Sequence, residues 1–186
     1  MVIMPLLGFA HPLVSGVVGL AGLILVLVGL RGLADFHKEQ GIFNNALYGF
    51  ILVIVGVVVA VGVAIVSLVA WFVSIGVNIG DISRWSELGP ALSGYFQNPS
   101  NMGGIFGFIG AIIAVLLVLF LFVVVAAIFM RKSLNLLAKK TGVSMFGTAG
   151  IILLIGAVLT IIAVGIILIW VSFILMAVAF FQMKTK

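Results

Sequence analysis

The sequence predicts an all-α membrane protein with four transmembrane helices. Hydrophobic residues make up 65% of the 186 residues and charged residues only 7%, whereas soluble domains carry about 25% charged residues. No Asp, Glu, Lys, Arg or His occurs in residues 45–78, 102–130 or 141–183. Each of these runs exceeds the ~20 apolar residues that cross a bilayer core. We therefore expect a single transmembrane bundle over residues 1–186.

The first predicted helix covers residues 12–40. Pro12 suits its first turn, because that turn needs no backbone N–H from the residue. Gly41 is expected to end the helix in the left-handed conformation that glycine adopts easily. Residues 1–12 are apolar, but prolines break them and they are too short to span alone, so we expect them at or in the membrane interface.

The second predicted helix covers residues 44–76, with Asn44 or Asn45 as its N-cap. A long polar connection, residues 77–102, follows it. Its aromatic residues fit the belt that forms at the level of the lipid headgroups. We expect one or two short interfacial helices there, lying on the membrane.

The third and fourth predicted helices cover residues 103–141 and 144–183. Gly142 is expected to end the third helix and Ser144 to cap the fourth. At 1.5 Å per residue each helix would be ~55–60 Å long. This length exceeds the membrane, so the helices must tilt, bend or project from it.

The distribution of Lys and Arg predicts the orientation of the chain in the cell membrane. Six of them belong to the first and third connections and three to the second connection and the C-terminus. Cytoplasmic segments carry the excess of positive charge. We therefore expect the first and third connections in the cytoplasm and both termini outside.

The two halves of the chain match at an offset of 101 residues. Lys38 matches Lys139, Gly41 matches Gly142, and a short Ile-Leu-x-Ile run that follows Gly49 recurs after Gly150. This match predicts two tandem helical hairpins of the same orientation, the parallel kind of internal repeat.

Small residues mark the predicted helix-packing or interface positions. Gly16, Gly19 and Gly22 recur on the first helix, and Gly103, Gly107 and Ala111 recur on the third. Small side chains let helix backbones approach closely in lipid. The pattern fits packing within the bundle, and it also fits contact with a partner or with a second copy.

Charged residues give two further candidate sites. One is a basic group that is expected to set the topology and to meet anionic lipid headgroups: Arg131, Lys132, Lys139 and Lys140. The other is a weaker candidate for partner contact in the second connection, which also fits salt bridges on an interfacial turn: Asp81, Arg84, Trp85 and Glu87.

The sequence offers little catalytic chemistry. It has no Cys, and the predicted first helix separates His11 from His37 by about 39 Å, so the two cannot share a haem. The apolar runs hold only a few Ser and Thr side chains, whereas pumps and carriers place ionisable residues inside the membrane. We therefore expect no enzyme, no cofactor, no metal and no nucleic-acid partner.

Three stretches of the sequence resemble a known family. They are Gly22 to Asp35, the run Gly41-Ile-Phe-Asn-Asn-Ala-Leu-Tyr-Gly49, and the tail from Thr148 through Ile169-Trp170 to Phe181. The chain resembles an archaeal family of small integral membrane proteins known as a domain of unknown function. The resemblance implies an archaeal source and four membrane helices. It supplies no catalytic residues.

Two functions from different classes fit these expectations. The first is a non-catalytic structural or accessory subunit of a larger membrane assembly, such as an energy-transducing complex, in contact with lipids and other membrane subunits. The alternative is a homo-oligomeric channel or transporter for a small solute. Fixed partners after gentle extraction would favour the first function, and flux through a self-assembled ring would favour the second.

Overall fold

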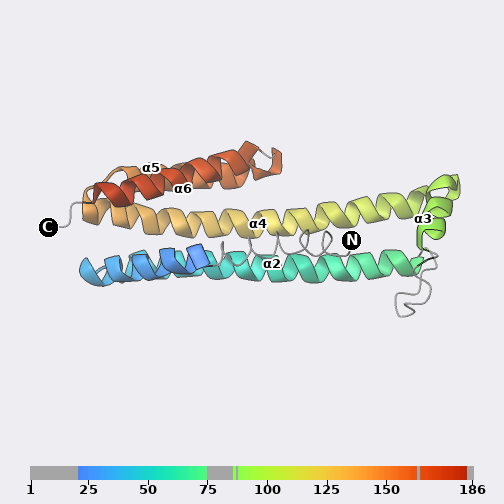
Figure 1. The fold of residues 1–186 in the computed structure, drawn as a ribbon, viewed down its shortest axis with the longest axis horizontal. Coiled ribbons are helices and arrows are strands. Elements are labelled where there is room, and N and C mark those ends of the chain that lie inside the picture. The colour runs from blue at the N-terminus through green and yellow to red at the C-terminus, as the bar shows by residue number, and fades with distance from the viewer. Residues whose placement is uncertain (1–20, 75–85, 87, 163, 184–186) are drawn as a thin grey trace, which may run out of the picture. The chain divides into compact units, whose positions relative to one another are not determined.

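The computed structural model describes residues 21–74, 86, 88–162 and 164–183, and the regular elements within them are helices (Figure 1). The first covers residues 21–36. The others are α2 (Gln40–Ser74), α3 (Leu88–Gln97), the 3₁₀ helix η2 (Pro99–Asn101), α4 (Met102–Thr141), α5 (Met145–Leu159), the 3₁₀ helix η3 (Thr160–Ile162) and α6 (Val164–Gln182).

Four segments are long and apolar enough to cross a membrane, namely α2, α4, Met145–Ile162 and Val164–Gln182. This confirms the expected all-helical class with four helices able to span. The four are not those predicted, however. The start of the predicted first helix lies outside the described residues, and the predicted fourth helix, residues 144–183, is two helices.

The predicted fourth helix is divided in the structure, which corrects the prediction. No charge or proline interrupts residues 144–183, so the sequence alone predicts one helix. In the structure α5 ends at Leu159 and Thr160 is its C-cap, whose hydroxyl donates to the Gly156 carbonyl oxygen at 2.9 Å. Such a bond back to the preceding turn bends helices. α6 then packs against α5, and the two lie side by side (Figure 1).

The first turn also differs from the expectation. Helix 21–36 ends in a Schellman motif, in which Glu39 N–H donates to the Ala34 carbonyl at 2.9 Å and Lys38 N–H to that of Asp35 at 3.3 Å. The left-handed residue is Lys38, with φ of 52°, and not Gly41. Gly41 lies in the first turn of α2, where a Cβ would come 2.9 Å from Leu136 Cδ1. The predicted stop at Gly142 has the expected left-handed φ of 74°.

The chain forms two compact units. Unit 1 comprises Met1–Ile51 and Ala126–Lys186, and unit 2 comprises Leu52–Val125. Both α2 and α4 therefore contribute residues to each unit.

The described part of unit 1 has a buried apolar core to which helix 21–36, α2, α4, α5 and α6 contribute. Ser133 Oγ donates to the Ile42 carbonyl oxygen at 2.6 Å and links α4 to α2. Ser172 Oγ donates to the Ala149 carbonyl oxygen at 2.8 Å and links α6 to α5. The core residues are Leu30, Ala34, Ile42, Ala46, Leu134, Leu137, Phe146, Ala149, Met176 and Ala179.

Unit 2 is held by aromatic packing at one end of its helices. The Trp71 ring stacks on Phe108 with centroids 4.5 Å apart and meets the edge of Tyr95 at 6.1 Å. Tyr95 of α3 also lies directly over Gly104 of α4. Indole and phenol rings are typical of the headgroup level of a membrane, so this cluster has the composition of an interfacial belt.

Candidate functional site: the charged end of unit 1

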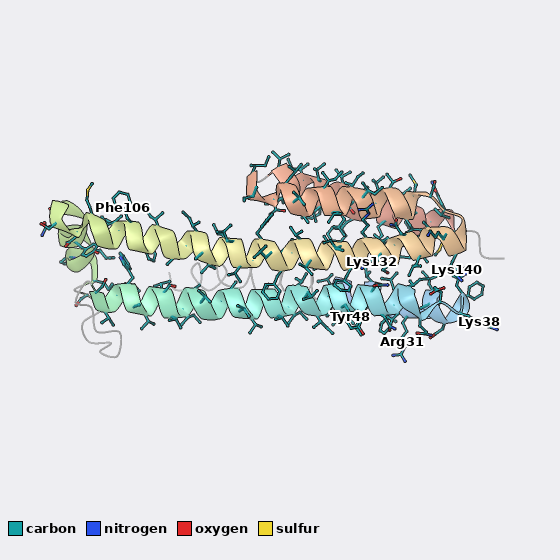
Figure 2. All side chains as sticks on the ribbon, turned by 180° about the vertical axis from the view of Figure 1, so that it is seen from behind. Arg31, Lys38, Tyr48, Phe106, Lys132 and Lys140 are labelled. Carbon is teal, nitrogen blue, oxygen red and sulfur yellow. The ribbon has the colours of Figure 1, made fainter. Side chains whose placement is uncertain are left out.

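The basic side chains of unit 1 gather where helix 21–36 turns into α2 and where α4 turns into α5. Figure 2 shows Arg31, Lys38, Lys132 and Lys140 toward this end. We call residues 30–49, 131–150 and 171–182 the charged end. It holds six cations, Arg31, Lys38, Arg131, Lys132, Lys139 and Lys140, against two carboxylates, Asp35 and Glu39. It therefore carries a clear excess of positive charge.

Side chains of the same unit contact both carboxylates. Lys140 Nζ lies 3.2 Å from Glu39 Oε2, and the two side chains are 42% and 32% exposed. An ion pair this exposed contributes little stability. Asp35 Oδ1 accepts a hydrogen bond from Gln40 Nε2 at 2.9 Å. The other five cations form no ion pair with a carboxylate among the described residues of this unit.

Two cations on α4 lie beside apolar groups. Lys132 Nζ is 5.4 Å from the centroid of the Phe129 ring. Arg131 runs along α5, where a Cβ on Gly150 would come 3.3 Å from Arg131 Cα. Its Nε atom is buried and has no hydrogen-bond partner in the part of the chain that the structure describes. An unpaired guanidinium N–H is a donor suited to a phosphate or carboxylate oxygen.

An exposed apolar stripe runs along α6 at the same end. Trp170, Ile174, Val178 and Phe181 are 67%, 59%, 38% and 90% exposed. Their spacing places them on one face of the helix. The neighbouring Phe180 packs on Phe146 with ring centroids 5.0 Å apart, which places Phe181 near the start of α5 and thus near Lys139 and Lys140.

The structure places the predicted glycine positions away from close contacts. Gly16 and Gly19 lie outside the described residues. A Cβ on Gly22, Gly103 or Gly107 would meet nothing within 4 Å in the described part of the chain, and Ala111 is half-buried. These positions are therefore open for a partner, and their role stays a prediction.

Close helix contacts occur at other glycines. A Cβ would come 2.9 Å from the Ala126 carbonyl oxygen at Gly49 and 2.5 Å from Phe122 Cβ at Gly56. Gly150 fits against Arg131, and Gly156 against Gly165. The offset match had paired Gly49 with Gly150, but sequence reasoning did not identify these glycines as contact points.

The other predicted positions add no candidate site within the described residues. Asp81, Arg84, Trp85, Glu87 and His11 lie outside the described residues. His37 is a half-buried turn residue whose ring meets Phe36 at 5.1 Å. Within the described ranges, no group of three or more His, Cys, Asp or Glu side chains could hold a metal ion. The basic side chains of the charged end can attract anions, and the exposed stripe of α6 can make apolar contacts.

The helices able to span and the charged end define a multi-pass helical membrane protein. Residues 18–174 match the family described as "Protein of unknown function (DUF996)". The chain belongs to this family, which confirms the resemblance seen in the sequence. It is 28% identical over 173 residues to "Uncharacterized protein MJ1644" of Methanocaldococcus jannaschii, covering 91% of this chain and 81% of the relative. No solved structure matches the chain.

Proposed function

We propose that the protein is a non-catalytic structural or accessory subunit of a larger membrane assembly, which docks through the exposed stripe of α6. The α6 stripe carries the proposal. Phe181 is 90% exposed and lies near the turn that holds Lys139 and Lys140, whose ammonium groups need water or lipid phosphates. Acyl chains do not reach that level, so a protein surface suits the stripe better.

The long helices support the same function. In the most apolar part of α2 and of α4, only 11% of the residues are buried within the chain. On α4 the glycines at 103, 107 and 110 have open space around them. Small residues form the surfaces against which other membrane helices pack.

The basic group fits contact with anionic lipid headgroups. Lys132 and Lys139 are exposed. Basic residues next to a span bind anionic lipids, with about 1 kcal/mol per residue. The charged end then faces the cytoplasm of a cell-membrane protein, since positive charge stays on that side.

Two architectural expectations remain proposals. The sequence match of Gly49 with Gly150 supports a duplicated hairpin. The two contacts are not equivalent, however, because Gly49 lies against α4 and not against helix 21–36, and the left-handed residue is Lys38 in one turn and Gly142 in the other. The aromatic side chains of α3 support a position at a membrane surface.

The test is extraction of the tagged protein from native membranes in a mild detergent, followed by native electrophoresis and protein identification. We expect fixed partners in constant ratio. Phe181→Ser should release them, and Phe36→Ser, which changes another exposed Phe (75% exposed), should not. A band that contains this chain alone would contradict the proposal and lead to flux assays for the oligomeric channel.

A further inference from the structure

We infer that the hairpin formed by α5 and α6 enters the membrane from the charged side, turns inside the hydrocarbon, and returns to the same side. Its tip, residues 160–162 and 164, would thus contact the acyl chains of lipid and not the opposite aqueous face. Although both helices are long enough to span by composition, their packing and their depth favour this re-entrant arrangement.

The two helices run antiparallel over their whole length. Phe146 near the start of α5 packs on Phe180 near the end of α6, and Ala149 accepts the hydrogen bond from Ser172. At the other end Gly156 and Gly165 are in backbone contact. The start of α5 and the end of α6 therefore lie at the same end of unit 1, which places the C-terminal end of α6 beside Lys139 and Lys140. The earlier expectation of an outside C-terminus assumed one helix over residues 144–183.

Arg131 limits how deep the hairpin reaches. Because Gly150 lies against Arg131 Cα, the two residues lie at the same depth in the membrane. An arginine in a membrane protein keeps its guanidinium at the headgroups, so Gly150 lies near the membrane surface. Trp170, two residues before Ser172 and 67% exposed, suits the same level. From Gly150 to Ile162 the chain rises about 18 Å, little more than half of the ~30 Å hydrocarbon core.

The tip has the composition of a segment in hydrocarbon. Ile161, Ile162 and Val164 are 65%, 59% and 51% exposed, and the uncharged run from 141 to 183 contains the whole turn. Turns at an aqueous face favour Gly, Pro, Asn, Asp and Ser.

Backbone polar groups in hydrocarbon need internal partners. The Thr160 N–H donates to the Ala157 carbonyl oxygen, and the Thr160 hydroxyl donates to that of Gly156. Gly165 lies directly on the Thr160 nitrogen and on the Leu159 backbone, so α6 covers this part of the turn. Both observations fit a turn that is shielded from lipid by its own chain.

The experiment uses single cysteines, since the chain has none of its own. Ile161→Cys marks the tip, Gln182→Cys the end of α6, and Asn98→Cys the segment between α3 and α4. Each variant is treated with a membrane-impermeant maleimide in sealed vesicles of both orientations, and again after detergent is added. Unchanged gel filtration and helical circular dichroism show that a variant is folded.

We expect Gln182→Cys to react only from the cytoplasmic side, Asn98→Cys only from the outer side, and Ile161→Cys from neither side until detergent is added. A fluorophore on Ile161→Cys should be quenched more by a nitroxide deep in the acyl chain than by one at the headgroup. Labelling of Ile161→Cys from the outer side, or stronger quenching at the headgroup, would overturn the re-entrant hairpin. Outer-side labelling of Gln182→Cys would instead show α5 and α6 as one spanning helix.

Discussion

Phe146→Ala tests whether the core of the charged end is built as in a water-exposed domain. Phe146 is 0% exposed and meets Phe180 edge-on, with centroids 5.0 Å apart and planes at 75°. Truncation of a buried Phe in a core folded in water costs about 3–5 kcal/mol, which lowers the folding equilibrium constant by roughly two to three and a half powers of ten. The cost in hydrocarbon should be smaller, because lipid is as apolar as the side chain.

The assay is unfolding in mixed micelles with a rising fraction of a denaturing detergent, followed by circular dichroism. Phe181→Ala is the control, since that side chain follows Phe180 on α6, is 90% exposed and should change the free energy of unfolding by less than about 0.5 kcal/mol. A loss below about 1 kcal/mol for Phe146→Ala, or an equal loss in both variants, would refute a water-driven core at this end.

Three further substitutions test single contacts. Gly165→Val should open the α5–α6 hairpin and lower the unfolding midpoint, whereas Gly62→Val, at a position with open space, should leave it unchanged; equal effects would contradict the close backbone contact. Ser133→Ala should cost about 0.5–1.5 kcal/mol in the same unfolding assay, because it removes the hydrogen bond between α4 and α2. Lys132→Gln should weaken retention of an anionic lipid in native mass spectrometry about fivefold, and unchanged retention would count against headgroup contact.

The sequence predicts the class of fold well, because long uncharged runs have few alternatives to membrane helices. The extent of α4 is close to the predicted helix 103–141, since it ends at Thr141 and Gly142 follows it in the left-handed conformation. Loss of hydrophobic character and a glycine stop are both local signals, and local signals can be read from sequence.

The α5–α6 hairpin could not be predicted in the same way. Its turn contains no proline, charge or asparagine, and it depends on contact between Gly156 and Gly165, which is a tertiary effect. The Schellman turn was missed because Lys38, a residue that rarely adopts positive φ, takes the position expected for Gly41.

The candidate site was only partly predictable. The basic residues of α4 were identified from charge alone, but the exposed stripe from Trp170 to Phe181 looks in the sequence like any other lipid-facing face. The stripe is a candidate docking surface because its end lies beside Lys139 and Lys140, outside the acyl chains. That position follows from the antiparallel packing of α6 on α5.

The mass of the intact particle extracted from native membranes tests the proposed role most directly. One chain has a mass of 19.6 kDa. We expect a particle whose mass includes other chains in fixed number, and which loses this chain when Phe181 is changed to Ser. A mass equal to a whole multiple of this chain, with bound lipid alone, would contradict the role of accessory subunit.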